Sequence, residues 1–243
     1  MLPFWIALQF LSSLPVRLAG MPGPAALGRS LLWYPAVGLL FGLILAWLQW
    51  LLGAVAPMLQ AALLLGAWVL LSGALHLDGL ADSADAWLGG FGDRARTLEI
   101  MKDPRSGPLA VVTLIVVLLL KFSALLVLVE RGQGALLVAV PVIGRTAVLG
   151  LFLSTPYVRP GGLGQALADH LPRPAGRWVV GLTALALWGG FGDPLLWMLG
   201  MAAVVFYSVR RMLLRRLGGT TGDTAGALLE LVEVAALLAV AVR

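Results

Sequence analysis

The stretch GPLAVVTLIVVLLLKFSALLVLVE, Gly107–Glu130, decides the class of fold. Its only charged residues are Lys121 and the final Glu130, and it exceeds the roughly 20 apolar residues that a helix needs to cross a bilayer core. The whole chain has the same character, because 60% of its 243 residues are hydrophobic and 12% are charged. Soluble domains usually carry about 25% charged residues. The sequence therefore predicts an integral membrane protein.

Apolar stretches of this kind recur along the chain. The predicted spans are Leu31–Ala56, Met58–Leu77, Gly107–Glu130, Ala135–Thr155, Arg177–Phe191, Pro194–Val209 and Thr224–Val242. The fifth and sixth are short and are separated only by GGFGDP, so they alternatively form a hairpin that does not fully cross. The N-terminal MLPFWIALQF predicts a short interfacial or re-entrant helix. We expect a polytopic all-α bundle with six or seven spans, forming a single catalytic domain over residues 1–243.

The positive residues are distributed unevenly between the two ends of the predicted spans. When the spans alternate in direction, Arg131 and Arg243 fall on one side and the remaining basic loop residues fall on the other. Basic loop residues mark the cytoplasmic side of a membrane protein. We therefore expect a multi-pass protein of the cell inner membrane. The net charge of +5 then reflects topology and does not require a nucleic acid partner.

An acidic cluster follows the second predicted span, in HLDGLADSADAWLGGFGD, which begins at His76. Asp78, Asp82 and Asp85 share one face of a helix at this spacing, and Gly79 lets a ligand approach the backbone. The alternatives are a solvated acidic loop and a divalent cation site. Without cysteine the ligands are oxygens, which suit Mg²⁺. His76 is a candidate general base, although a histidine at this position also serves to orient an aspartate or to pack.

The next segment, GDRARTLEIMKDPRSGP, predicts an amphipathic helix that is capped by Asp93 and ends at Asp103. It provides Lys102 and Arg105 as cations for binding phosphate beside the carboxylates. Pro108 suits the first turn of the following span.

A glycine-rich turn, GGTTGDTAG, precedes the last span. Backbone amides at the start of a helix form a site for phosphate, and the alternative is a plain helix cap. Asp223 or Thr224 is the expected N-cap, and Asp223 is also a candidate metal ligand. The candidate phosphate-binding residues are Gly218, Gly219, Thr220, Thr221 and Gly222.

Lys121, Arg145, Glu230 and Glu233 fall inside the predicted spans. Ionisable residues at membrane depth are rare unless they pair or line a cavity. They are therefore candidates for structural ion pairs, for the charged wall of a pocket, or for both. The similar depths of Arg145 and Glu233 predict an ion pair between facing helices.

The motifs HLDGLADSADA, EIMKDPRSGP and GGTTGDTAGALLELVE resemble those of the cobalamin synthase family, the adenosylcobinamide-GDP ribazoletransferases. The resemblance implies a magnesium-dependent membrane enzyme that joins α-ribazole or its 5′-phosphate to adenosylcobinamide-GDP and releases GMP. The product would be adenosylcobalamin or its 5′-phosphate. For this reaction we expect Asp78, Asp82 and Asp85 to bind the metal, with Asp223 as an additional ligand. The candidate base is His76 or an aspartate such as Asp82.

Two other functions use some of the same features. A membrane phosphotransferase for another nucleotide-activated alcohol needs similar metal chemistry, but its aspartate motif usually contains an arginine, which DGLADSAD lacks. A transporter would account for the charges within the spans, but it predicts ligand groups near the bilayer midplane and related halves. The densest polar cluster lies instead at the end of a span.

Overall fold

The computed structural model describes residues 1–243, apart from the side chain of Leu163, and the chain folds as helices joined by loops. The helices are α1 (Leu2–Leu11), α2 (Pro24–Ser30), α3 (Tyr34–Leu51), α4 (Pro57–Ser72), α5 (Leu75–Gly89), α6 (Arg94–Ile100), α7 (Pro108–Glu130), α8 (Ala139–Ser154), α9 (Leu163–Asp169), α10 (Arg173–Phe191), α11 (Asp193–Leu217) and α12 (Gly222–Ala241). Short 3₁₀ helices, η1 (Leu31–Trp33) and η2 (Gly134–Val138), precede α3 and α8.

Five helical segments in the described chain are long and apolar enough to cross a membrane: Pro24–Leu51, Pro108–Glu130, Gly134–Ser154, Asp193–Leu217 and Gly222–Ala241. A sixth crossing is present if α4 and α5, which meet at 86°, form one broken span. The expected polytopic all-α fold and the short apolar helix at the N-terminus are confirmed. The count of seven is not reached, because the fifth predicted span belongs to α10, whose charged first turns lower its hydropathy.

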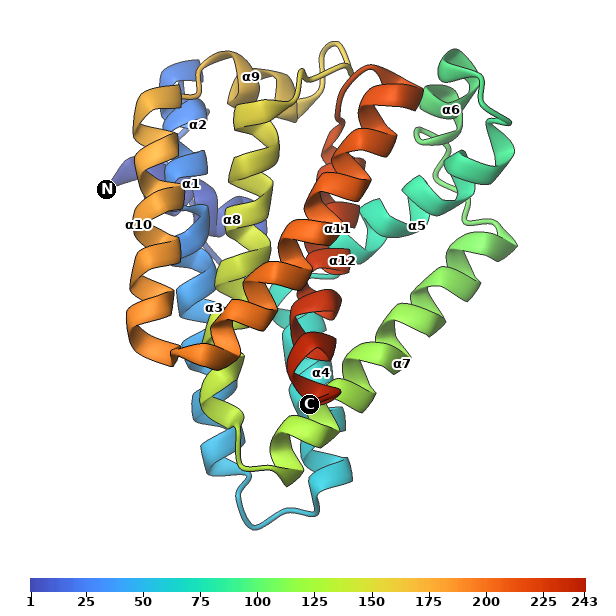
Figure 1. Ribbon diagram of the computed structural model, residues 1–243. Helices are drawn as coiled ribbons and strands as arrows, with labels where there is room; N and C mark the ends of the chain where they lie inside the picture. The colour runs from blue at the N-terminus through green and yellow to red at the C-terminus, as the bar shows by residue number, and fades with distance from the viewer.

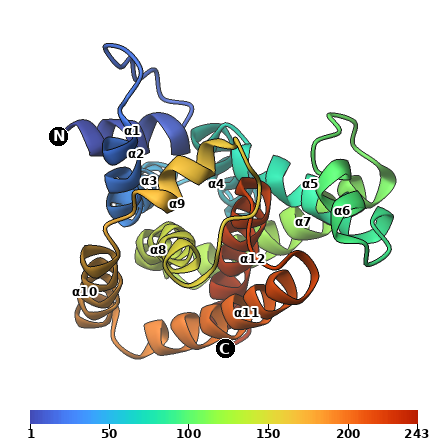
Figure 2. The ribbon, with the colours of Figure 1, turned by 90° about the horizontal axis from the view of Figure 1, so that it is seen from above.

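Helices α8 and α12 form the centre of the bundle (Figures 1 and 2). Within their most apolar windows, 72% and 83% of the residues are buried, compared with 17% for α11 at the periphery. Glycines allow α3 to pack closely against the start of α8. A Cβ atom on Gly38 would lie 2.5 Å from the carbonyl oxygen of Pro141, and one on Gly42 would lie 2.5 Å from that of Val138. Small residues of this kind let the backbones of membrane helices approach.

The second predicted span ends earlier than expected, at the sharp bend between α4 and α5. Gly73 and Ala74 both have positive φ, of 59° and 56°. Ser13 satisfies the last carbonyls of α4, because its hydroxyl donates to Leu70 at 2.5 Å and its N–H donates to Leu71 at 2.8 Å. The bend therefore directs α5, with its aspartates, away from the axis of α4 (Figure 1).

The boundaries of α6 and α7 follow local rules. The Asp93 side chain accepts the N–H of Arg96 at 2.7 Å, which confirms the predicted N-cap. Helix α6 ends at Ile100, before the predicted end at Asp103. Helix α7 begins at Pro108, as predicted.

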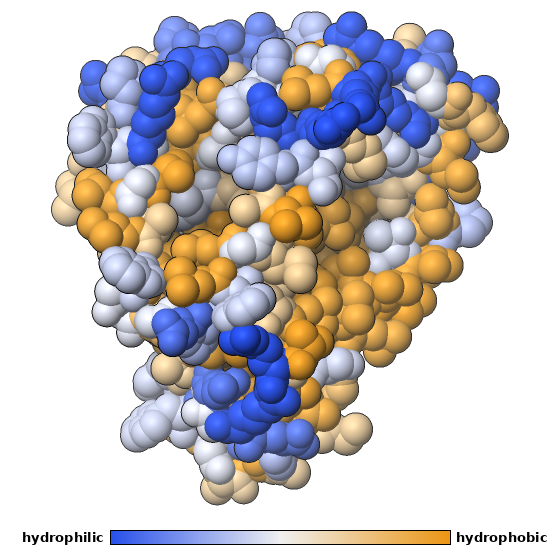
Figure 3. Space-filling view, in the orientation of Figure 1, coloured by the Kyte–Doolittle hydropathy of each residue, from blue (hydrophilic) through white to orange (hydrophobic). Residues whose placement is uncertain are grey.

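The surface is divided into polar ends and apolar flanks. Figure 3 shows hydrophilic residues gathered at the upper and lower ends of this face and hydrophobic residues covering its sides. The exposed large apolar side chains include Val111, Ile115 and Leu119 of α7, Leu182 of α10 and Val204 of α11. An apolar belt between polar ends is the surface that a lipid bilayer requires.

A buried ion network joins α7, α8 and α12. The Nζ atom of Lys121 lies 2.7 Å from a carboxylate oxygen of Glu230 and 2.7 Å from one of Glu233. The other oxygen of Glu233 contacts Nη1 of Arg145, which confirms the predicted ion pair. All four side chains are nearly inaccessible to solvent, and their charges sum to zero. The Arg145 guanidinium also lies 4.6 Å from the centre of the Phe41 ring.

We expect this network to stabilise the bundle as a unit. Arg145→Met or Glu233→Gln alone leaves an unbalanced buried charge and should cost about 3–5 kcal/mol. The double variant restores neutrality, so its thermal unfolding midpoint in detergent should fall by less than the sum of the two single decreases. Strict additivity of the three midpoints would contradict coupling between the two residues.

Candidate active site

A cavity of about 430 Å³ lies among α1, α3, α5, α8, α9, α12 and the loop after α8. Its polar lining includes His76 and Asp78 of α5, Arg159 of the loop and Asp223 of α12. Its apolar lining includes the rings of Phe10, Tyr34, Phe152 and Tyr157. The motifs HLDGLAD and GGTTGDTAG therefore meet at one cavity, although they lie far apart in the chain.

Helices α5 and α12 approach each other at two glycines. A Cβ atom on Gly79 would lie 2.7 Å from the carbonyl oxygen of Asp223, and one on Gly226 would lie 3.2 Å from the Cα atom of His76. Larger residues would force the helices apart. Gly79 also lines the cavity, so the expectation that a ligand approaches its backbone stays a prediction. The close approach puts Asp78 and Asp223 in the wall of the same cavity.

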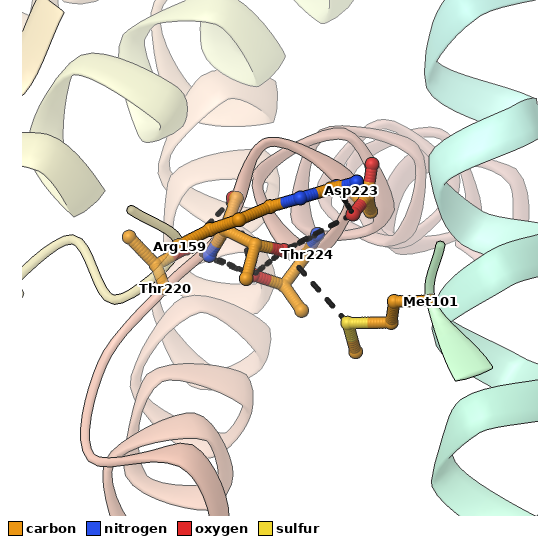
Figure 4. Close-up of polar contacts among 6 residues, drawn as sticks. Met101, Arg159, Thr220, Asp223 and Thr224 are labelled. Atoms are coloured by element: carbon orange, nitrogen blue, oxygen red, sulfur yellow. Dashed lines mark hydrogen bonds and ion pairs between the residues drawn. The ribbon is translucent and has the colours of Figure 1, made fainter. Parts of the chain in front are cut away.

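The glycine-rich turn is ordered by a capping box. Gly218, with φ of +73°, ends α11. The Thr221 hydroxyl accepts the N–H of Thr224 at 3.2 Å, and the Thr224 hydroxyl accepts the N–H of Thr221 at 2.9 Å (Figure 4). The predicted N-cap, Asp223 or Thr224, is therefore wrong, because Thr221 and Thr224 satisfy two terminal amides reciprocally. The spacing of these threonines in TTGDT is the signal that identifies the cap.

The predicted phosphate-binding residues of the turn are mostly turned inward. Thr220 and Thr221 are fully buried, and their hydroxyls contact other groups of the turn. Gly219 packs against the loop after α8, since a Cβ atom there would lie 2.3 Å from the carbonyl oxygen of Pro156. Gly222, the first residue of α12, is the member of the predicted set that lines the cavity. Its backbone is therefore the part of the turn that is accessible from the cavity.

The loop after α8 adds an arginine to the site. The Val158 N–H donates to the carbonyl of Thr220 at 2.9 Å, and the Thr220 N–H donates to that of Pro156 at 2.8 Å. This pairing brings Arg159 to α12, where its Nη1 lies 2.6 Å from Oδ2 of Asp223 (Figure 4). Nothing in the sequence singled out Arg159 as a site residue, because its partner is 64 positions away and the pairing depends on the fold.

Aromatic residues line the side of the cavity next to this loop. The rings of Phe152 and Tyr157 are stacked at 16°, with their centres 6.1 Å apart. Burial raises the pKa of the Tyr157 phenol above its ordinary value, so the phenol is neutral at physiological pH. Tyr34 is 1% exposed and Phe152 is 3% exposed, so both rings are fixed by their surroundings.

Asp85 has a structural role in this fold. Its two carboxylate oxygens accept the N–H groups of Gly107 and Ala110, the latter at 2.9 Å, at the start of α7. A carboxylate at this end of a helix satisfies free amides and opposes the positive end of the helix dipole. Asp85 is therefore less available as a metal ligand than its helical register suggested.

Asp78 and Asp82 follow the predicted helical spacing on α5. Asp78 is exposed and lines the cavity, whereas Asp82 lies one turn further along and is half-buried. The negative charges of Asp78, Asp223 and Asp85 all repel that of Asp82. Among the side chains that the structure describes, no three acidic or histidine groups converge on one metal position. The metal site therefore stays a prediction.

His76 lines the inner part of the cavity and is 5% exposed. Its Nδ1 atom is buried and has no hydrogen-bond partner among the described residues. Burying a polar nitrogen without a partner is costly, so such an atom in a cavity wall calls for a ligand or a water molecule.

Lys102 and Arg105 do not line the cavity in this structure. Both are exposed, and Nη2 of Arg105 lies 2.6 Å from Oδ2 of Asp103, a contact that lowers the Asp103 pKa to about 2. Their loop nevertheless begins beside the glycine-rich turn, where the Met101 sulfur lies 3.9 Å from the Thr221 hydroxyl (Figure 4). Their role in binding phosphate stays a prediction.

The fold and this cavity define a class: a multi-pass membrane protein with a carboxylate-bearing pocket at the end of its central helices. Residues 3–241 match the cobalamin-5-phosphate synthase family. The chain is 70% identical to the adenosylcobinamide-GDP ribazoletransferase of Pseudomonas fluorescens over 243 residues, which cover 99% of each chain. It is 70% identical over 245 residues to the protein of that name from Pseudomonas putida, again covering 99% of each chain. No solved structure matches the chain. The chain belongs to the cobalamin-5-phosphate synthase family, as its motifs predicted.

The roles of Asp85 and Asp82 are separable by measuring stability. Asp85→Asn should lower the thermal unfolding midpoint in detergent, because an amide group cannot accept both N–H groups of α7, and a lost cap costs about 1 kcal/mol. Asp82→Asn is the matched control and should not lower the midpoint, since it removes a charge that is repelled by its neighbours. Equal stability of the two variants would exclude a capping role for Asp85.

Proposed function

We propose that this protein transfers α-ribazole or α-ribazole 5′-phosphate onto adenosylcobinamide-GDP and releases GMP. Adenosylcobalamin or its 5′-phosphate is the product. The observation that carries the proposal is the match to adenosylcobinamide-GDP ribazoletransferases at about 70% identity over 99% of the chain. The meeting of the HLDGLAD and GGTTGDTAG motifs at one cavity supports the same conclusion.

The reaction is a displacement at phosphorus. A ribose hydroxyl of the acceptor attacks the phosphorus attached to the corrinoid side chain, and the bond between that phosphorus and the bridging oxygen breaks as GMP departs. The hydroxyl proton passes to a base, for which Asp82 and His76 are the candidates. Arg159 supplies a positive charge beside the cavity, and the backbone at Gly222 begins a helix whose dipole favours phosphate oxygens.

The available donors fit Mg²⁺. The ion prefers oxygen ligands and is usually held by one or two carboxylates together with substrate phosphates. Asp78 and Asp82 carry no ion pair among the described side chains, and Asp223 shares its carboxylate with Arg159. When bound, Mg²⁺ neutralises the charge that develops on the phosphates. Because substrate phosphates supply part of the coordination, the protein without substrate does not need three ligands that converge on one metal position.

We place the site on the cytoplasmic side of the inner membrane. The glycine-rich turn, the loop after α8 and the loop after α6 lie near one end of the bundle (Figure 1), and most of the basic loop residues belong to the segments that connect the helices at this end. The positive-inside rule assigns such an end to the cytoplasm.

The alternatives receive less support. The interpretation as a transporter predicts charged groups that line a path near the midplane. The four charges within the spans instead pair with one another. The cavity-lining residues that the structure describes include none of the four. A phosphotransferase for another nucleotide-activated alcohol predicts turnover without a corrinoid.

Purified protein in detergent should convert adenosylcobinamide-GDP and α-ribazole phosphate to GMP and a complete corrinoid when Mg²⁺ is added. Asp82→Asn should lower kcat by at least about a hundredfold, because a lost metal ligand or base removes several kcal/mol of transition-state stabilisation. Chromatographic detection of both products is the measurement. Binding of the substrates without release of GMP would overturn the proposal.

The topology is testable because the chain contains no cysteine. Ala54→Cys, between α3 and α4, and Ser106→Cys, between α6 and α7, are both at exposed positions. In right-side-out membrane vesicles an impermeant maleimide should label the cysteine at position 54, and it should label the one at position 106 only after lysis. Labelling of position 106 in sealed vesicles would place the site outside the cytoplasm.

A further inference from the structure

The lining of the cavity combines aromatic and charged side chains. It contains four aromatic residues, Phe10, Tyr34, Phe152 and Tyr157. It also contains the carboxylates of Asp78 and Asp223 and the guanidinium of Arg159. A ligand that fills this space therefore has a flat apolar part and a polar part.

The volume of the cavity indicates which of the two substrates of the proposed reaction fits inside it. Pockets for drug-sized ligands measure about 300–1,000 Å³, and the cavity, at about 430 Å³, lies in the lower half of that range. α-Ribazole is a dimethylbenzimidazole joined to ribose, and it matches both the size of the cavity and its combination of aromatic and charged side chains. Adenosylcobinamide-GDP carries a corrin macrocycle, an adenosyl group and a nucleotide, and is several times larger.

We infer that this cavity is the pocket for the benzimidazole nucleoside acceptor, and that His76 recognises its base. The inference rests on the proposed function. The base stacks on aromatic rings of the lining, and the ribose points toward Asp78 and Asp223. The corrinoid remains outside the cavity and presents its diphosphate at the polar end.

His76 supplies the specific contact with the base. A benzimidazole nucleoside has one free ring nitrogen, which accepts a hydrogen bond and donates none. The His76 side chain is 95% buried, since 5% of the residue is exposed, and its Nδ1 atom lacks a partner. A neutral imidazole with its proton on that atom donates to the free nitrogen of the base. The contact satisfies two polar atoms that are otherwise left unpaired in an apolar setting.

This role differs from that of a general base. As a positioning residue for the acceptor, His76 acts on acceptor binding, so its replacement should raise the KM for α-ribazole more than it lowers kcat. The residues near the polar end, Asp78, Asp82 and Asp223, remain the groups close to the reacting hydroxyl.

The first experiment measures occupancy without turnover. Leu75 lines the cavity and is 41% exposed, so Leu75→Cys provides a single thiol in a chain without cysteine. Saturating α-ribazole should slow its reaction with a maleimide by about fivefold or more, because a bound ligand of this kind buries most of its surface in the pocket. GMP should not slow it, and neither ligand should slow labelling of the Ser106→Cys control. Protection by GMP alone, or equal rates with and without α-ribazole, would overturn the assignment of the pocket.

The second experiment tests the contact with the base in the unmodified chain. The ribosyl derivative of 5,6-dimethylindole has the shape of α-ribazole but lacks the free ring nitrogen. It should compete for the acceptor site about tenfold more weakly, the cost of one unsatisfied buried donor. His76→Leu should abolish this difference, and His76→Gln, which keeps an N–H donor, should retain part of it. Equal competition by the two nucleosides in the unmodified chain would exclude the contact.

These outcomes are distinct from a failure of the proposed function. Absence of GMP release with intact α-ribazole protection would refute the reaction and keep the nucleoside pocket. GMP release without protection at position 75 would keep the reaction and refute the pocket.

Discussion

The crossing of α5 and α12 at Gly79 and Gly226 is the constraint on which the site depends. The Cβ positions of both glycines fall within 3.2 Å of the opposite backbone, so a side chain at either position would separate the helices. Separation would move Asp78 away from Asp223. It would also displace the first turn of α12, to which Arg159 and the loop after α8 are attached. The cavity is thus a product of two backbones in contact, and its side chains take their positions from that contact.

The buried ion network holds the same helix near its middle. Glu230 and Glu233 belong to α12, and their cations come from α7 and α8. Within an apolar bundle, paired charges define the position of a helix more strictly than apolar contacts do. If α12 rotated or slid, its charges would be left unpaired in surroundings that cannot solvate them. The network therefore fixes the register of α12, and the register determines which residues of its first turn reach the cavity.

The sequence was sufficient to predict the features that depend on residues close together in the chain. The apolar stretches, the cap at Asp93 and the start of α7 at Pro108 follow from composition and from rules that act within a few residues. The Arg145–Glu233 pair was predictable because depth in a membrane restricts the choice of partners. The role of Asp85, the bend after Ser72 and the position of Arg159 were not predictable. Each depends on a group distant in the chain, respectively an amide of α7, a serine after α1 and a carboxylate of α12.

The aspartates of α5 show why residue type alone does not define a site. They share one helical face, yet Asp85 is occupied by the amides of α7, whereas Asp78 and Asp82 face Asp223 with Arg159 as the nearby cation. Such an arrangement leaves an excess of negative charge beside the cavity. In the proposed function Asp78, Asp82 and Asp223 would hold a divalent cation, which would relieve this repulsion and strengthen the binding of the substrate diphosphate. In the proposed function an acceptor hydroxyl held inside the cavity would attack the phosphorus from the side opposite to the departing GMP, as in-line displacement requires.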